Sequence, residues 1–401
     1  MTKKLFYNDA YQTSFDTQVV KNDKDEEGRD YVVLEETAFY PTGGGQPFDE
    51  GTLNEIRVDN VEEVDGEVRH YVAEPLDAST VNGVVDWARR FDHMQQHSGQ
   101  HILSAIMQDE FGMATLSFHL GAEIVSIDLD ATDLTEETLE KAEERVNEVI
   151  RDNRPIETKW MTVDESNQYP LRKKLAVDEA VRLVVIPDVD YNGCGGTHPR
   201  STGEVQMIKL LGWSRQKKIV RLEFVCGNRV LEQLGNKHKV LNGIKGLMKR
   251  PEEALEQEVS SFIKESKQKD KQLAEQMAQL LEYEARDLAS TAGEAAGVPV
   301  IERVYENRTI KTLQDLGKKI VEQTPSGIVV LVSEQKDQLQ YVLAQGANCS
   351  GNMKEAAEKV MPLIEAKGGG KPNFVQGGGT KAIAADAFAE RLREAALETV
   401  E

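Results

Sequence analysis

Five potential metal ligands share one spacing. His93, His97 and His101 follow one another at four-residue steps in a stretch with helical periodicity, and Cys194 and His198 lie four residues apart in a run of small residues. Positions i and i+4 project from one face of a helix, so either neighbouring pair of these histidines can offer two imidazoles to one ion. A thiolate and a third imidazole complete the nitrogen and sulfur set that tetrahedral zinc prefers over calcium or magnesium. The pattern predicts a zinc site, although a purely structural zinc would use the same set of ligands.

The segments that must position these ligands are predicted to form an α+β domain over residues 91–250. Helical spacing covers residues 93–111, and a second amphipathic helix is expected over 135–152, where acidic residues occupy the first turn and arginine the last. Apolar runs at 181–186 and 219–225 are typical of strands. Helices on one side of such a sheet give the α+β class.

Residues 1–90 are expected to form a small β-barrel-like domain, because short β-rich runs alternate there with glycine, proline and aspartate. The most unusual segment is 39–47, which contains Gly43, Gly44 and Gly45 in succession. Consecutive glycines let the backbone take positive φ and approach another surface closely. A merely flexible loop is the alternative interpretation.

The C-terminal part of the chain is predicted to contain two further regions. Residues 251–292 have apolar side chains at three- and four-residue steps, which predicts a helical connector or a short coiled coil, with the seam interrupted at Ser266 and Lys269. Residues 293–401 alternate strand and helix patterns and carry glycine-rich stretches at 368–371 and 376–379. We expect a separate C-terminal α/β domain there.

Charge is unevenly distributed along the chain. The net charge of −21 argues against nonspecific nucleic-acid binding by the whole surface, because phosphate contacts need clustered lysine and arginine. Between residues 204 and 250, however, eleven basic residues occur with three acidic ones, so 11 − 3 gives +8. We interpret this basic island as a phosphate-binding surface, with Arg215, Lys217, Lys218 and Arg221 as candidates and a solvated surface as the alternative.

Length and composition limit the class of protein. At 401 residues the chain should contain several domains, and 39% hydrophobic with 29% charged residues is ordinary soluble composition. No stretch approaches the ~18 uninterrupted apolar residues of a membrane span, and the first residues lack a secretory signal. Three widely spaced cysteines argue against a disulfide framework. We therefore expect a cytoplasmic protein with no membrane partner.

The motifs together resemble the long form of the alanyl-tRNA editing family, often called AlaX, and the editing domain of alanyl-tRNA synthetase. The matching segments, in chain order, are 39–47, Arg90 with 93–103, 115–121, 194–198 and 202–204. The glycine-rich stretches near the end look like the DHH-associated domain that ends alanyl-tRNA synthetases. Phosphoesterases with that domain carry an Asp-His-His motif, whereas Asp92 and His93 are followed here by Met94.

This resemblance implies a zinc-dependent aminoacyl-tRNA deacylase acting on mischarged tRNA(Ala). The wrong amino acid would be chiefly serine and, in some members, glycine, and the zinc ligands would be His97, His101, Cys194 and His198. Zinc could hold the attacking water or orient the substrate. Residues assigned to substrate binding are Thr42, Gly43, Gly44, Gly45 and His93. Residues assigned to proton transfer are Gln100, Ser117 and His119.

The resemblance also implies how the protein works with its partners. Residues 1–90 leave no room for an ATP-using aminoacylation domain, so we expect editing in trans without ATP. The tRNA would contact the basic island, and a homodimer through the helical connector and the C-terminal domain is a further expectation. The rival hypothesis is a noncatalytic zinc protein that binds tRNA. Turnover of a seryl-tRNA ester would distinguish the two.

Overall fold

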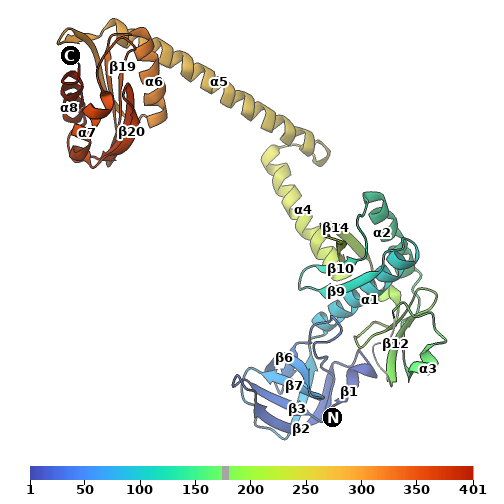
Figure 1. The fold of residues 1–401 in the computed structure, drawn as a ribbon. Helices are drawn as coiled ribbons and strands as arrows, with labels where there is room; N and C mark the ends of the chain where they lie inside the picture. The colour runs from blue at the N-terminus through green and yellow to red at the C-terminus, as the bar shows by residue number, and fades with distance from the viewer. Residues whose placement is uncertain (174–179, 401) are drawn as a thin grey trace. The chain divides into compact units, whose positions relative to one another are not determined.

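The computed structural model describes residues 1–173 and 180–400, which divide into two compact units, Met1–Leu247 and Met248–Glu401 (Figure 1). Strands and helices are mixed in both units, so the predicted α+β character is confirmed. None of the described helices is long and apolar enough to cross a lipid bilayer.

The first unit begins with a closed β-barrel. Its six strands follow one another around the barrel in the order β2, β3, β7, β6, β5 and β8. Buried and exposed residues alternate strictly along β8, as a strand with one face toward a core requires. The strand bounds are Ser14–Lys24 for β2, Asp30–Leu34 for β3, Gly51–Leu53 for β5, Ile56–Val64 for β6, Glu67–Val72 for β7 and Thr80–Val85 for β8. A short parallel pair, β1 (Lys3–Lys4) with β4 (Glu36–Thr37), and the 3-10 turn η1 (Leu5–Tyr7) lie beside them in the chain.

A long helix, α1 (Trp87–Asp109), follows the barrel directly. Asp86 caps it by accepting the backbone N–H of Arg89, and most of its residues from Arg90 onward are buried. Together with α2 (Glu136–Arg151) it packs on a four-stranded sheet through one shared apolar core. The sheet order is β14, β15, β10, β9, with bounds Ile208–Gln216, Ile219–Cys226, Val125–Leu129 and Thr115–Leu120. The helices predicted at 93–111 and 135–152 are thereby confirmed.

A second, three-stranded sheet completes this domain. Its order is β11 (Glu157–Thr162), β12 (Ala180–Ile186) and β13 (Asp190–Gly193), and β11 runs into the short helix α3 (Val163–Ser166). Because β13 ends at Gly193, the sheet delivers the next residue, Cys194, directly to the surface of α1. A 3-10 turn, η2 (Thr202–Val205), then leads to β14.

One long helix was missed by the sequence analysis. It is α4 (Asn228–Met248), which carries four of the eleven basic residues of the island. Three glycines interrupt its pattern, at Gly235, Gly243 and Gly246, and Arg229 is its only buried residue. Several of its apolar residues, including Leu234 and Ile244, are exposed, and the three glycines lower the helix propensity of the segment.

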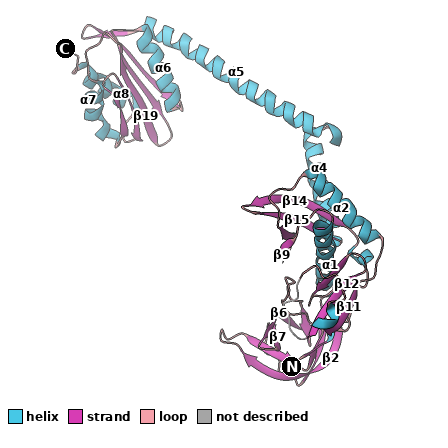
Figure 2. Cartoon of the chain, turned by 45° about the vertical axis from the view of Figure 1, so that its right-hand side comes forward, coloured by secondary structure: helices cyan, strands magenta, loops and turns pink. Residues whose placement is uncertain are grey.

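The second unit begins with the predicted connector helix. After η3 (Glu252–Ala254) comes α5 (Leu255–Ser290), whose last turns bury Leu281, Ala285 and Leu288 against α6 (Ile310–Gln323). Figure 2 shows this long helix running into the C-terminal domain.

The C-terminal domain is a sheet with helices on both faces. The sheet order is β16, β17, β18, β19, β21, β20, with bounds Gly293–Ala295, Val298–Glu306, Ile328–Glu334, Gln338–Gln345, Phe374–Thr380 and Lys367–Lys371. Helices α5 and α6 cover one face. Helices α7 (Met353–Val360) and α8 (Ala385–Leu397) cover the other, and η4 (Met361–Ile364) extends α7. The two glycine-rich stretches form the paired strands β20 and β21.

Candidate metal centre

The four residues predicted as ligands converge on one point. Ligand atoms of His97, His101, Cys194 and His198 all lie within 4.8 Å of one another, an arrangement that could hold a metal ion. The Nε2 atoms of His97 and His198 each lie 3.4 Å from the Cys194 Sγ. The three imidazoles are buried and the cysteine is half-buried, so the cluster is largely shielded from bulk water.

Each imidazole of the cluster has its other nitrogen occupied by a protein group. Nδ1 of His97 lies 2.9 Å from Gln46 Oε1, and Nδ1 of His101 lies 2.6 Å from Asp190 Oδ2. Nδ1 of His198 lies 2.8 Å from Ser98 Oγ. Such partners fix the ring orientation and leave Nε2 free, as in protein metal sites. All three histidines therefore present Nε2 toward Cys194.

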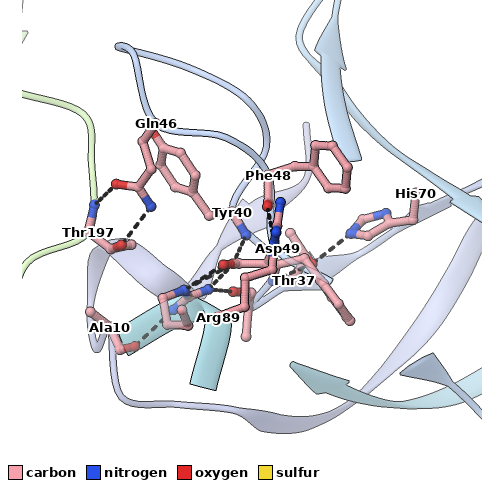
Figure 3. A network of polar contacts seen from close by, with 12 residues as sticks. Ala10, Thr37, Tyr40, Gln46, Phe48, Asp49, His70, Arg89 and Thr197 are labelled. Atoms are coloured by element: carbon pink, nitrogen blue, oxygen red, sulfur yellow. Dashed lines mark hydrogen bonds and ion pairs between the residues drawn. The ribbon is translucent and has the colours of Figure 1, made fainter. Parts of the chain in front are cut away.

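Gln46 orients His97 with little ambiguity. Its Oε1 also accepts the backbone N–H of Thr197 (3.1 Å), and its Nε2 donates to the Thr197 hydroxyl (2.8 Å) (Figure 3). Because the amide oxygen can only accept, the nitrogen of His97 facing it must carry the proton. The same side chain thus joins the first histidine pair to the loop that carries the other ligands.

A tight turn brings Gln46 to this position. Gly43 and Gln46 exchange two backbone hydrogen bonds (3.0 and 2.9 Å), and the two residues between them have φ of 57° and 84°. These are the positive values of a type I′ turn, which glycine adopts most readily. The predicted positive φ in this segment is confirmed at Gly44 and Gly45.

Close approach to a neighbouring ring also requires glycine at two positions of the site. A Cβ on Gly196 would lie 2.3 Å from Cε1 of His97, and a Cβ on Gly45 would lie 2.8 Å from the ring of Phe118. Phe118 itself stacks on His97, with ring centroids 5.3 Å apart and planes at 29°. The glycine-rich turn, the phenyl ring and the ligand loop therefore enclose His97 from three directions.

A buried ion pair fastens α1 to the barrel beside this site. Arg90 and Asp49 are both fully buried, and Nε of Arg90 lies 3.0 Å from each carboxylate oxygen. Arg90 also donates to the carbonyls of Ala10 and Ala38, and Asp49 accepts the backbone N–H of Tyr40 (2.6 Å). Every described group of the pair has a partner, so the start of the histidine helix is held in a fixed relation to the glycine-rich turn.

The electrostatics of the cluster suit a transition metal. Burial opposes ionisation of the Cys194 thiol, but the His97 and His198 imidazoles outweigh it and hold the thiol pKa well below its usual value. Burial would also lower the pKa of His101, yet hydrogen bonds to Asp190 and Cys194 raise it to about 9. Burial lowers the pKa of His198 to about 3. Because metals bind thiolate and neutral imidazole, these donors fit zinc once His101 gives up its proton.

The structure places the predicted proton-transfer residues away from the cluster contacts described above. Gln100 donates to Ser104 within α1 (2.7 Å). On β9, Phe118 lies against His97, and because side chains alternate along a strand, Ser117 and His119 point to the opposite face. Ser117 donates to Asp128 there (2.7 Å). The contacts given for Gln100 and Ser117 do not reach the four ligands, and the catalytic roles of Gln100, Ser117 and His119 stay predictions.

The predicted substrate-binding residues lie closer to the cluster. Gly43, Gly44 and Gly45 form the turn described above, while the exposed Thr42 is tied to the barrel by its backbone N–H, which donates to Val61 (3.1 Å). His93 lies one turn before His97 on α1 and is 3% exposed. Its Nδ1 has no hydrogen-bond partner among the described residues, and burial lowers its pKa to about 3, so it is a neutral imidazole at physiological pH.

The predicted phosphate-binding residues surround one hairpin. Lys217 and Lys218 form the exposed turn between β14 and β15. Arg215 pairs with Asp133, and Arg221 pairs with Asp128 through two contacts of 2.8 and 2.9 Å. Because both arginines already have carboxylate partners, the two lysines are the more available of the four residues for contact with a phosphate.

The sequence did not indicate the side chains that contact and orient the ligating histidines. Gln46, Ser98, Asp190 and Phe118 were not proposed as site residues, although 46, 98 and 118 lie inside the motifs named above. Asp190 is held in turn by Arg172 (2.6 Å). Its signal was weaker, since it lies four residues before Cys194 in an otherwise ordinary strand.

Two family models match segments of the chain. Residues 2–89 match the family described as tRNA synthetases class II (A), and residues 181–223 match the family described as Threonyl and Alanyl tRNA synthetase second additional domain. The C-Ala domain from Aquifex aeolicus alanyl-tRNA synthetase is similar over 26% of this chain and 97% of that one, at 21% identity. Its TM-score of 0.25 supports no conclusion about the fold.

Two curated relatives extend over nearly the whole chain. Alanyl-tRNA editing protein AlaX-L of Pyrococcus horikoshii is 30% identical over 94% of this chain and 94% of its own length. Alanyl-tRNA editing protein Aarsd1 of Mus musculus is 31% identical over the same shares. From this identity along both chains, the protein belongs to the alanyl-tRNA editing protein family.

Proposed function

We propose that this protein is a zinc-dependent deacylase that removes a wrong amino acid, chiefly serine and also glycine, from tRNA(Ala). The observation that carries the proposal is the convergence of His97, His101, Cys194 and His198, with each imidazole oriented by a partner on Nδ1. Relatives that carry the name alanyl-tRNA editing protein supply the substrate class.

Zinc is the metal that this donor set favours, because one thiolate and three imidazoles suit a tetrahedral ion. When bound, zinc supplies Lewis acidity that can polarise an ester carbonyl or lower the pKa of water toward about 7. The chain itself supplies rigid ligands. Gln46 and Asp190 hold His97 and His101 in place, while burial keeps bulk water from the ligand atoms.

Thr42 is our proposed contact for the substrate side chain. Its side chain is exposed next to the glycine-rich turn that touches Phe118 and His97. A hydroxyl that bonds serine would be left unpaired by alanine, and this discriminates more strongly than pocket size alone. Thr42→Val should therefore reduce the preference for seryl over alanyl esters, whereas Thr42→Ser should retain it.

We propose that the β14–β15 hairpin contacts tRNA phosphates through Arg215, Lys217, Lys218 and Arg221. Exchange of Lys217 and Lys218 for alanine should weaken tRNA binding and reduce the slope of log affinity against log salt by about two. The variant Lys336→Ala on the second unit is a control for a general loss of positive charge. An unchanged salt slope in the double variant would remove this hairpin from the interface.

A homodimer through the connector is the last part of the proposal. It is supported by large apolar side chains that are exposed along α5. They include Phe262, Ile263, Leu273, Leu280 and Tyr283. Sedimentation of the full chain should give twice the 44.7 kDa protomer mass. A monomer at micromolar concentration would refute this part alone.

The deciding experiment for the function is hydrolysis of seryl-, glycyl- and alanyl-tRNA(Ala) at catalytic protein concentration. The seryl ester should be cleaved fastest and the alanyl ester spared. Cys194→Ala should abolish turnover while leaving tRNA binding intact. Zinc and tRNA binding without turnover by the wild-type protein would instead establish the noncatalytic alternative.

A further inference from the structure

A tryptophan near the metal loop is left largely uncovered. Trp160 on β11 is 58% exposed, although tryptophan usually buries most of its large ring. Its one aromatic neighbour within the described residues is Tyr7, with ring centroids 5.5 Å apart and planes at 82°. An exposed indole next to an aromatic neighbour offers a flat apolar face on which a planar ligand can stack.

Arg182 and Tyr7 lie between this indole and the loop that carries Cys194. Trp160 is directly opposite Arg182 in the β11–β12 register, and the Arg182 guanidinium lies over the Tyr7 ring, 5.1 Å from its centroid. Arg182 donates to the carbonyls of Cys194 and Gly196, both at 2.8 Å. The Tyr7 hydroxyl lies 3.5 Å from where a Cβ on Gly195 would be. The aromatic pair therefore adjoins the loop that holds two of the metal ligands.

Arg182 gives this region a preference for negative charge. It is 6% exposed, and its partners among the described residues are two carbonyl oxygens and the Tyr7 ring. Its Nε has no hydrogen-bond partner in that part of the chain. The Cys194 thiolate offsets part of the charge of Arg182. The Nε of Arg182 still offers a donor, and guanidinium favours phosphate groups.

We propose that Trp160, Tyr7 and Arg182 form the site that receives the 3′-terminal nucleoside of the tRNA. The terminal base stacks on the exposed indole, and the charge of Arg182 favours the phosphodiester group that precedes it. This places the ribose that bears the ester between the indole and the metal loop. The inference rests on the proposed function, because it takes tRNA as the substrate.

Stacking suits this task physically. Every nucleobase has a π-face, so an aromatic platform holds the end of the chain without reading its sequence, and discrimination is left to the amino-acid pocket. Two neighbouring aromatic rings and a cation are the combination found in sites for single-stranded nucleic acid. Trp160 is then a positioning residue, since it acts on the nucleoside and touches no reacting atom.

The test is a binding cycle with uncharged tRNA(Ala) and the same tRNA lacking its terminal adenosine. Affinities are measured for the full-length wild-type protein, Trp160→Ala, Trp160→Phe and Lys159→Gln. Lys159 is a matched control, because it neighbours Trp160 on the same strand and faces the opposite side. Trp160→Ala should weaken binding of complete tRNA about tenfold, within the range for losing one base–aromatic stack. It should leave binding of the shortened tRNA unchanged, and Trp160→Phe should retain most of the affinity.

Two results would overturn the inference. Either an equal loss for both tRNAs or no loss for either would show that the indole does not recognise the terminal base. Hydrolysis of seryl-tRNA is measured separately on the same preparations. If the four proteins bind the two tRNAs as expected but the wild-type protein does not hydrolyse seryl-tRNA, the proposed function fails while the nucleoside site stands. Hydrolysis by the wild-type protein, without a selective loss of affinity for complete tRNA in Trp160→Ala, would remove the nucleoside site and leave the proposed function standing.

Discussion

Replacement of Gln46 by methionine tests whether the glycine-rich turn sets the metal affinity. Methionine keeps the length and approximate volume of the side chain but removes both hydrogen-bonding functions. Gln46 is fully buried, and its amide makes three contacts, at 2.9 Å to His97 Nδ1, 3.1 Å to Thr197 N and 2.8 Å to Thr197 Oγ1. Gln46→Met therefore deprives one ligand and its loop of their common partner.

The magnitude follows from these contacts. Loss of the group that orients a ligating histidine typically weakens metal binding about 10- to 100-fold. Two N–H donors, from His97 and Thr197, also lose their acceptor, and a buried donor without a partner costs about 1–3 kcal/mol. The free energy of unfolding should thus fall by about 2–6 kcal/mol.

Zinc affinity is measured by competition with a chelating dye, and stability by urea unfolding. Gln18→Met makes the same chemical change on an exposed residue of the barrel and should alter neither quantity. Gln46→Thr would test whether a shorter acceptor restores part of the affinity. Zinc binding by Gln46→Met as tight as that of the wild type would refute the role assigned to this side chain.

Three further predictions follow from other contacts. Gly196→Ala should lose most of its bound zinc, measured by elemental analysis, because the new Cβ would lie 2.3 Å from His97, whereas Gly195→Ala meets only the Tyr7 hydroxyl at 3.5 Å and should retain it. Asp49→Asn should lower the free energy of unfolding by about 3–5 kcal/mol, because Arg90 would be left fully buried without its counter-charge; a loss below 1 kcal/mol in urea unfolding would contradict this. Burial lowers the pKa of His70 to about 4, so below pH 6.5 the unfolded chain takes up a proton that the folded chain refuses. The contribution of His70 to the free energy of unfolding is therefore fully present above pH 6.5 and falls by up to about 3 kcal/mol toward pH 4. In His70→Gln, the free energy of unfolding should fall less steeply over this pH range.

Local spacing predicted that a neighbouring pair among His93, His97 and His101 would bind the ion, because helix geometry fixes which residues share a face, and the family resemblance indicated which pair. His97 and His101 are four residues apart on α1, and the structure brings both to Cys194 and His198 as expected. The same reasoning predicted α2 and α5, whose apolar residues recur at helical steps. It failed for α4, whose apolar residues are interrupted by three glycines, residues that weaken a helix.

Contacts between distant segments could not be predicted in this way. Gln46 is 51 residues from His97, and Asp190 is 89 residues from His101, so only the folded chain shows that they meet. Alternation along β9 predicts that Phe118 faces away from Ser117 and His119, but it does not say which face meets the metal. In the folded chain it is the face of Phe118 that meets His97.

Zinc titration of metal-depleted protein, with the rate of seryl-tRNA(Ala) hydrolysis recorded at each addition, tests the proposed metal centre. Activity should be absent without metal, rise in proportion to bound zinc and stop rising at one equivalent per chain, with no rise in Cys194→Ala. Full activity in the metal-free protein, or restoration of Cys194→Ala by the same single equivalent, would contradict the proposed metal centre.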